Sequence, residues 1–276
     1  MAEHKKVIPG DLAKAHAQQP PTLAQSLGLR RGDVISLVGG GGKTSLMFSL
    51  AGELASAGSR VITTTTTKIM EPGHFESPLL ILEADEDKLT REVGLKMDEY
   101  RHITVAKERL PSGKLGGISP EAVIKLSRLA SVDYIIVEAD GAARKSLKAP
   151  NSTEPVIPAN TTLVVAVVGI EAVGRELTGE NVFRPEIVSQ LTGLSPGDFV
   201  TGDAVAVLIT HPLGLTRGSP SGARIVPFIN KMDLDPGFVR GRELAEAVIS
   251  RGHPRIERVI LGRLQSSSPV VEIISK

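Results

Sequence analysis

A run of glycines followed by lysine and threonine is the strongest chemical signal in the sequence. It occupies residues 39–44, and a serine follows it. Glycine backbones turn at positive φ and bring amide N–H groups close to phosphate oxygens, a lysine ammonium neutralises phosphate charge, and a threonine hydroxyl binds Mg²⁺. The segment therefore predicts a phosphate-binding loop for a nucleoside triphosphate. Its expected binding residues are Gly39, Gly40, Gly41, Gly42, Lys43, Thr44 and Ser45.

The spacing of this loop departs from the usual G-x-x-x-x-G-K-[ST] pattern. The residue five positions before Gly42 is Leu37, not glycine. What remains is the shorter G-x-x-G-K-T spacing of Mur-type ligases. A glycine-rich turn with a surface lysine is the alternative interpretation. We favour phosphate binding because the segment lies between a strand-like apolar run and a helical pattern, where a backbone can wrap a phosphate at a helix N-terminus.

A second motif, N-K-x-D, follows an apolar run near the end of the chain. It comprises Asn230, Lys231 and Asp233, in the arrangement with which GTPases recognise guanine. The carboxylate of Asp233 can accept hydrogen bonds from the guanine N1–H and exocyclic amine together, whereas adenine offers no such pair of donors. These three residues are therefore the expected base-binding residues, for GTP in preference to ATP. A strand-ending turn with a solvated ion pair is the alternative.

Two acidic residues, Glu138 and Asp140, end a third apolar run. A carboxylate at the carboxyl end of a parallel strand beside a phosphate loop usually holds Mg²⁺ or one of its waters. The E-x-x-G spacing that begins at Glu138 resembles the third motif of the GTPases that mature metalloenzymes. A carboxylate that caps the next turn is the alternative. Lys43, Glu138 and Asp140 are the expected catalytic residues, and the expected metal ligands are Thr44, Glu138, Asp140 and Thr67, which ends a run of five threonines.

Short apolar runs alternate with helical patterns along most of the chain. This alternation predicts an α/β fold of the P-loop NTPase-like class, with a mostly parallel sheet and helices on both faces. The expected strands are residues 34–38, 60–65, 134–139, 162–169, 225–230 and 258–262. Helices are expected at residues 23–27, 46–54 and 120–130.

The polar residues 1–21 predict a flexible N-terminal arm, and residues 22–276 a single domain. Residues 84–131 are more charged and less regular than the rest. They are either an insertion or the outer strands and helices of the same sheet.

Composition excludes several classes of function. The 32 basic and 31 acidic residues leave a net charge of +1, without the basic excess of a nucleic-acid or anionic-membrane binder. Cysteine is absent, which removes disulfides and thiolate metal sites. The longest apolar run, residues 163–170, is far shorter than the roughly 18 residues that span a bilayer. We therefore expect no nucleic-acid or membrane partner, and a cytoplasmic location.

Four segments of the chain, in this order, resemble the selenium-dependent hydroxylase accessory protein family, the YqeC-like proteins. They are GDVISLVGGGGKTSLM, TTTTK, VEADGAARKSLKAP and EPVIP, and the resemblance covers most of residues 23–276. It implies a nucleotide-using helper that assembles or inserts a cofactor during maturation of a selenium-dependent molybdenum hydroxylase. The implied partner is the apo-hydroxylase or a cofactor-assembly protein.

The last two of these segments contain three prolines, Pro150, Pro155 and Pro158. Prolines stiffen a loop, so we expect this one to present Lys148 and Glu154 to a substrate or partner. Further cationic candidates for binding a phosphate or a substrate are Lys68, Arg144 and Lys145, each of which has a solvated surface position as its alternative.

The sequence thus predicts a Mg²⁺-dependent NTPase, GTP-using rather than ATP-using, whose hydrolysis drives a conformational change or a cofactor transfer. Two alternatives remain open. An ATP-dependent ligase or kinase is favoured by the short glycine loop and opposed by the N-K-x-D motif. A nucleotide-gated scaffold that does not hydrolyse its ligand is the other.

Overall fold

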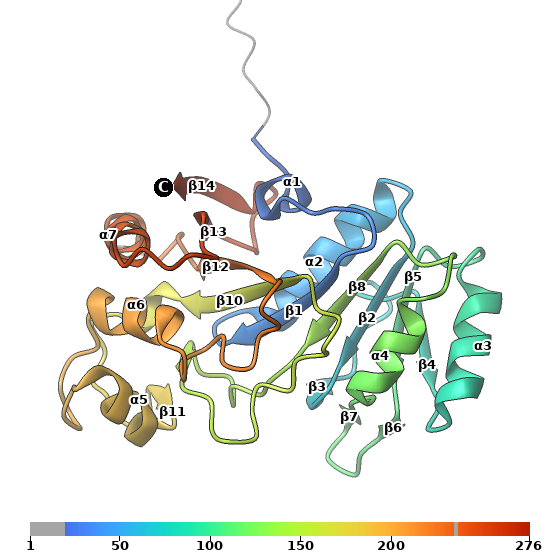
Figure 1. Ribbon diagram of the computed structural model, residues 1–276, viewed down its shortest axis with the longest axis horizontal. Helices are drawn as coiled ribbons and strands as arrows, with labels where there is room; N and C mark the ends of the chain where they lie inside the picture. The colour runs from blue at the N-terminus through green and yellow to red at the C-terminus, as the bar shows by residue number, and fades with distance from the viewer. Residues whose placement is uncertain (1–19, 235–236) are drawn as a thin grey trace, which may run out of the picture.

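The computed structural model describes residues 20–234 and 237–276. The predicted arm over residues 1–21 lies outside the described residues, except for its last two. A nine-stranded sheet with the order β14-β13-β12-β10-β1-β8-β2-β5-β4 forms the centre of the fold (Figure 1). All its strands are parallel except β14, which runs antiparallel to β13. They are β1 (Val34–Gly39), β2 (Val61–Thr65), β4 (Leu79–Leu82), β5 (His102–Ala106), β8 (Tyr134–Glu138), β10 (Leu163–Gly169), β12 (Arg224–Asn230), β13 (Arg258–Gly262) and β14 (Val270–Ser275).

Two small sheets continue from strands of the main sheet. One is antiparallel and has the order β3-β7-β6; the other pairs β9 with β11 in parallel. Since β3 follows β2 in the chain and β9 follows β8, both small sheets extend the carboxyl edge of the main sheet. Their strands are β3 (Lys68–Met70), β6 (Glu108–Arg109), β7 (Lys114–Gly116), β9 (Leu147–Lys148) and β11 (Val182–Phe183).

Helices cover both faces of the main sheet. Along β1, Ile35 and Leu37 pack in one cluster with α1 and α2, while Val34 and Val38 belong to clusters on the opposite face. Such alternation follows from the two-residue period of a strand. The helices are α1 (Leu23–Leu27), α2 (Lys43–Ser56), α3 (Glu86–Lys96), α4 (Pro120–Leu126), α5 (Pro185–Thr192), α6 (Gly202–Thr210) and α7 (Gly237–Ser250), with a 3-10 turn, η1 (Ile170–Ala172). In Figure 1, α3 and α4 lie near β4, and α5, α6 and α7 lie toward the side of the sheet that contains β12, β13 and β14.

This architecture confirms the expected fold class, because it is a mixed α/β fold with a mostly parallel sheet and is compatible with the P-loop NTPase-like class. All six expected strands are present within one residue of their predicted ends. The helix expected over residues 120–130 begins at Pro120, after Ser119 as its N-cap, but ends at Leu126. There the Ser127 hydroxyl donates to the backbone carbonyl of Ile124, and such local side-chain bonds compete with helix continuation.

Residues 84–131 contribute β5 to the main sheet, between β2 and β4. No strand is expected from the sequence over β5, where polar His102 and Thr104 alternate with apolar Ile103 and Val105. His102 and Thr104 are buried, and both bond to the hydroxyl of Thr63 on β2, at 2.9 and 2.7 Å. Paired polar side chains therefore fill this part of the sheet.

The connections around β1 diverge. The chain leaves β1 through α2 to β2 on one side, and after β8 it crosses to β10 on the other side of β1. In open parallel sheets, ligands bind outside the carboxyl ends of the strands at such a point. The fold therefore places the glycine loop, which follows β1, at the expected position for a ligand site.

Candidate functional site

The glycine loop passes so close to the end of β10 that side chains do not fit. A Cβ on Gly39 would lie 2.3 Å from the Val167 carbonyl oxygen, and one on Gly41 would lie 2.2 Å from the Gly169 nitrogen. Gly41 also has a φ of +78°, in the left-handed region. Close packing against β10 thus explains why glycines stand here.

The amide groups of this loop divide into two sets. Those of Gly39, Gly40 and Gly41 donate to Asp140 Oδ2, Val167 O and Lys145 O, at 3.1, 2.9 and 3.1 Å. They hold the loop in place. The helix α2 starts directly after the loop, and no side chain among the described residues caps it. Its first-turn N–H groups are therefore the amides that an anion can use.

A cavity of about 360 Å³ opens beside the start of α2. It brings together Lys43 and Thr44 from the start of α2 and Glu138 from the end of β8. We call it the phosphate-side cavity. Its lining comprises residues 41–45 of the loop and helix, Glu138, residues 141–145, Lys231, and Lys68, Ile69, Met70 and Lys114 of the small β3-β7-β6 sheet.

Lys43 is nearly buried, with 4% of its side chain exposed. Its Nζ donates to the Gly39 carbonyl oxygen at 2.6 Å and lies 3.2 Å from Asp140 Oδ1 and 3.7 Å from Glu138 Oε1. Burial alone would lower the pKa of Lys43, but the attraction of Asp140 and Glu138 outweighs it and raises the pKa. Lys43 is therefore a fixed positive charge at neutral pH.

The two acidic residues after β8 have different surroundings. Glu138 lines the cavity, and its Oε2 accepts a hydrogen bond from the Thr44 hydroxyl at 2.7 Å. Burial raises the pKa of Glu138, although Lys43 and Thr44 oppose this. Asp140 is 1% exposed and is not among the lining residues, since it lies behind the loop and bonds to Gly39 N–H, Lys43 and Lys148. Glu138 thus faces the cavity, whereas Asp140 fixes the loop.

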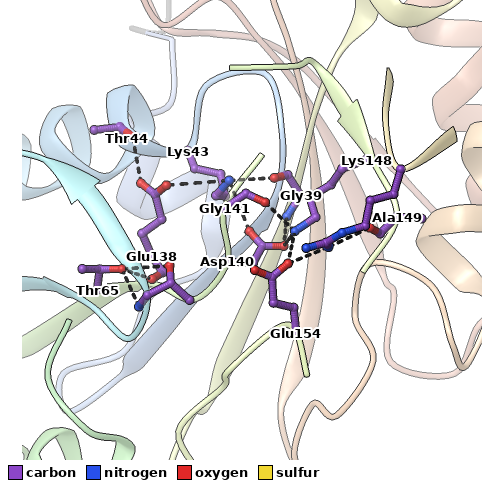
Figure 2. A network of polar contacts seen from close by, with 12 residues as sticks. Gly39, Lys43, Thr44, Thr65, Glu138, Asp140, Gly141, Lys148, Ala149 and Glu154 are labelled. Carbon is purple, nitrogen blue, oxygen red and sulfur yellow. Dashed lines mark hydrogen bonds and ion pairs between the residues drawn. The ribbon is translucent and has the colours of Figure 1, made fainter. Parts of the chain in front are cut away.

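Behind Asp140, the network continues through a completely buried lysine, Lys148. Its Nζ lies 3.0 Å from Asp140 Oδ2, and it donates to Gly141 O at 2.5 Å and to Glu154 Oε2 at 2.9 Å. Arg184 Nη1 binds the same Glu154 oxygen at 2.7 Å. Figure 2 shows this chain of contacts from Thr44 to Glu154. The expectation that the proline-rich loop presents Lys148 outward is wrong, because two carboxylates hold its ammonium inside.

The threonine run contributes to the same region through Thr65. Its hydroxyl donates to the Glu138 carbonyl oxygen at 2.7 Å and accepts from the Thr67 amide at 3.0 Å. The Thr67 hydroxyl lies 3.3 Å from that of Thr65, and Thr67 is not among the residues that line the cavity. The threonines therefore brace the end of β8, and a metal-binding role of Thr67 stays a prediction.

The N-K-x-D motif surrounds a second cavity, of about 270 Å³, which we call the base-side cavity. It shares Gly42, Ser45 and Lys231 with the phosphate-side cavity, so the two cavities adjoin. Its lining comprises Gly42, Ser45, Asn230, Lys231, Asp233, Leu234, Leu264 and Gln265. Asp233 is exposed there.

Asn230 and Lys231 are anchored within the protein. Asn230 Nδ2 donates to the Gly41 carbonyl oxygen at 2.8 Å, and Asn230 Oδ1 accepts from Leu264 N–H at 3.3 Å. Lys231, at a φ of +67°, donates to Ser146 Oγ at 3.0 Å and pairs with Glu171. Asn230 therefore ties the glycine loop to the segment after β13, and Asp233 is the member of the motif that is left to contact a ligand.

Comparison with known proteins agrees with the resemblance seen in the sequence. The model of the family described as YqeC protein matches residues 35–186. The chain is 33% identical over 253 residues to the uncharacterized protein YqeC of Escherichia coli (strain K12), which covers 89% of this chain and 93% of that protein. The chain belongs to the YqeC family. The part matched by the family model includes the glycine loop, Glu138, Asp140, Lys148 and Glu154, whereas the N-K-x-D motif lies beyond it.

Several residues of the site lie outside the expectations from sequence. Lys114 and Met70 reach the phosphate-side cavity because β3 pairs with β7, and no local pattern announces that pairing. Leu264 and Gln265 line the base-side cavity, although neither belongs to a motif of the sequence.

Neither a metal-binding cluster of side chains nor a membrane-spanning helix is found among the described residues. No group of three or more His, Cys, Asp or Glu side chains in the described parts of the chain is placed to hold a metal ion. Within those same parts, no helix combines the length and apolar character needed to cross a membrane.

Proposed function

We propose that this member of the YqeC family binds and hydrolyses a nucleoside triphosphate with Mg²⁺, and that it prefers GTP to ATP. The observation that carries the proposal is the convergence of Lys43, Thr44 and Glu138 on one cavity at the start of α2. A lysine and an uncapped helix N-terminus attract phosphate, and a hydroxyl beside a carboxylate suits a hard cation.

The donor set fits Mg²⁺. The Thr44 hydroxyl and the Glu138 carboxylate lie 2.7 Å apart, and both are oxygen donors. Mg²⁺ at nucleotide sites typically takes one or two protein ligands and completes its shell with phosphates and waters, so a larger protein cluster is not needed. Thr44 and Glu138 would hold the ion, which when bound neutralises phosphate charge. Asp140 would act as a positioning residue, since it orients Lys43 and the Gly39 amide.

On the base side, Asp233 would accept from the two donors of guanine in the adjoining cavity. Because Gly42 and Ser45 line both cavities, a single nucleotide would extend from one cavity into the other. Anchoring of Asn230 and Lys231 would keep Asp233 close to the glycine loop.

The proposal extends to a role in maturation of a selenium-dependent molybdenum hydroxylase. Its support is that two segments, EADGA and the stretch from KAP to EPVIP, resemble those of the accessory protein family. Nucleotide hydrolysis would drive a conformational change or a cofactor transfer to the apo-hydroxylase or to a cofactor-assembly protein. The contacts from Lys43 through Asp140 and Lys148 to Glu154 would join the nucleotide to the EPVIP segment.

Calorimetric titration of GTP and ATP with Mg²⁺ tests the nucleotide site. We expect GTP to bind more tightly, and Lys43→Ala to weaken binding at least about 30-fold, because a buried charged contact to phosphate is lost. Thr44→Ala, which leaves the Lys43 ion pairs in place, should reduce the dependence of binding on Mg²⁺. Lys88→Ala, an exposed lysine on α3, serves as the control. Absence of binding, or equal binding by wild type and Lys43→Ala, would refute the proposal.

An ATP-dependent ligase or kinase is the second candidate, favoured by the G-x-x-G-K-T spacing of the loop. Competition against a fluorescent GTP analogue separates the two, since ATP should displace it as well as GTP does if the second candidate is correct. Hydrolysis that stays at background with Mg²⁺ and the apo-hydroxylase present would instead indicate a nucleotide-gated scaffold.

A further inference from the structure

We propose that the outer half of the phosphate-side cavity binds a second ligand, a small molecule that carries a phosphate group, beside the terminal phosphate of the nucleotide. The position of the nucleotide rests on the proposed function. The second site itself rests on three exposed cationic side chains that line the cavity and do not belong to the glycine loop or to α2, Lys68, Lys114 and Arg144.

One wall of this outer half is a face of the small antiparallel sheet. Met70 on β3 pairs with Lys114 on β7, and Ile69 pairs with Leu115. Directly paired residues and residues two apart lie on the same face of a sheet, so Lys68, Met70 and Lys114 share one face. Ile69 and Leu115 are buried, whereas Lys68 and Met70 are exposed. The wall therefore offers two ammonium groups around one apolar side chain.

The loop of residues 141–145 also lines this cavity. Ala143 and Arg144 follow each other at φ values of +46° and +63°, although left-handed conformations are costly for residues other than glycine. Such backbone strain concentrates at ligand clamps and active sites. Here it gives the loop the turn in which Arg144 lines the cavity.

The three cationic side chains are not required to neutralise the charge of the nucleotide phosphates. Lys43 and Lys231 already have carboxylate partners in Asp140 and Glu171. In residues 20–234 and 237–276, Lys68, Lys114 and Arg144 form no ion pair with a carboxylate, although all three line one cavity. The nucleotide would be balanced by Lys43, the start of α2 and Mg²⁺. Like charges that converge without a counter-charge repel one another, so a further anion is the complement that this wall lacks.

The chemistry of the walls narrows the class of ligand. Arg guanidinium and Lys ammonium groups are the side chains that most often bind phosphate. Met70 and Ala142 add apolar surface beside them, which suits the organic part of a phosphate ester better than inorganic phosphate alone. The second ligand is therefore expected to be a phosphorylated small molecule rather than a polyanionic polymer.

Equilibrium dialysis of ribose 5-phosphate against the full chain, saturated with Mg²⁺ and a non-hydrolysable GTP analogue, tests this site. We expect one bound ribose 5-phosphate per chain, and no binding of ribose. The double variant Lys68→Glu/Lys114→Glu should weaken this binding at least about tenfold, since two charged contacts are lost. It should change the affinity for the analogue less than about threefold. The matched control is Lys88→Glu/Arg91→Glu, which makes the same charge change on the exposed side of α3.

Three results would overturn the second site. They are no binding of ribose 5-phosphate to the loaded protein, displacement of the GTP analogue by it, or an equal loss of analogue and ribose 5-phosphate in the double variant. If wild type does not bind the analogue, the proposed function fails separately. Dialysis without the analogue then decides the second site: binding that survives Lys43→Ala but not Lys68→Glu/Lys114→Glu supports it, and any other pattern refutes it.

Discussion

The two adjoining cavities carry their charges in different ways. On the phosphate side, the ionic groups behind the glycine loop are buried: Lys43, Asp140 and Lys148 are 4%, 1% and 0% exposed. On the base side, Lys231 is 39% exposed and Asp233 is exposed. Removing one partner of a buried ion pair strongly destabilises a protein, whereas exposed ion pairs contribute little to stability. The charged groups of the phosphate side are therefore held in place by the fold, whereas those of the base side are more open to solvent.

Asn230 connects the two regions. It is 5% exposed, and its two amide atoms bond to Gly41 of the glycine loop and to Leu264 of the base-side wall. A neutral side chain thus fixes the position of the base side relative to the phosphate side.

The largest expected difference between the regions is in stability. Lys148→Met leaves Asp140 and Glu154 with one buried counter-charge fewer, so we expect the free energy of unfolding to fall by about 3–5 kcal/mol. Lys231→Met removes the partly exposed pair with Glu171 and should cost about 1 kcal/mol or less. Urea unfolding of the two variants and wild type measures both values.

Equal losses in the two variants would contradict the comparison. A double variant, Lys148→Met/Glu154→Gln, provides a control, since it removes one of the carboxylates that the lysine neutralises. It should recover part of the stability lost in Lys148→Met alone.

Residues close together in the sequence were predictable. The glycine loop, the acidic pair after β8 and the six expected strands are local patterns, and the structure has them where the sequence indicates. The convergence of Lys43, Thr44 and Glu138 follows from the adjacency of β1 and β8 at the carboxyl edge of a parallel sheet.

Features that depend on distant pairing were not predictable. A lysine next to prolines reads as a surface residue, and only the folded arrangement of Asp140 and Glu154 makes burial of Lys148 favourable. Strand β5 has no continuous apolar run, because His102 and Thr104 interrupt it, and only the folded sheet brings both side chains to the Thr63 hydroxyl. Lys114 joins the site through strand pairing alone.

The next largest effect tests whether Asp233 on the base side determines the preference for GTP without contributing to the stability of the fold. Asp233→Asn should lower the preference for GTP over ATP about tenfold or more, because the amide cannot accept from both guanine donors. Its N–H donor matches the O2 oxygen of xanthine, so binding of xanthosine triphosphate should increase. The free energy of unfolding of this variant should stay within about 0.5 kcal/mol of the wild-type value. An unchanged GTP-to-ATP ratio in competition titrations would remove Asp233 from the base site, and Asp98→Asn, another exposed aspartate, is the control.

The smallest effect concerns the outer end of the buried network, at Glu154. Burial alone would raise the pKa of Glu154, but the hydrogen bonds from Arg184 and Lys148 outweigh it, so the pKa lies below its ordinary value of 4.5. A carboxyl with a lowered pKa in the folded state stabilises the protein above its unfolded pKa, and this contribution is lost as the pH falls through the folded value. We expect Glu154→Gln to cost about 1 kcal/mol at pH 7.

The difference between wild type and Glu154→Gln should shrink as the pH is lowered below 4.5, since wild-type Glu154 then becomes neutral as well. Measuring the free energy of unfolding of both proteins at several pH values from 7 downwards tests this change. Glu92→Gln, an exposed glutamate on α3, should give a small difference that does not vary over the same range. A Glu154→Gln difference that stays constant with pH would mean that Glu154 acts through packing and not through its charge, and the buried network would then end at Lys148.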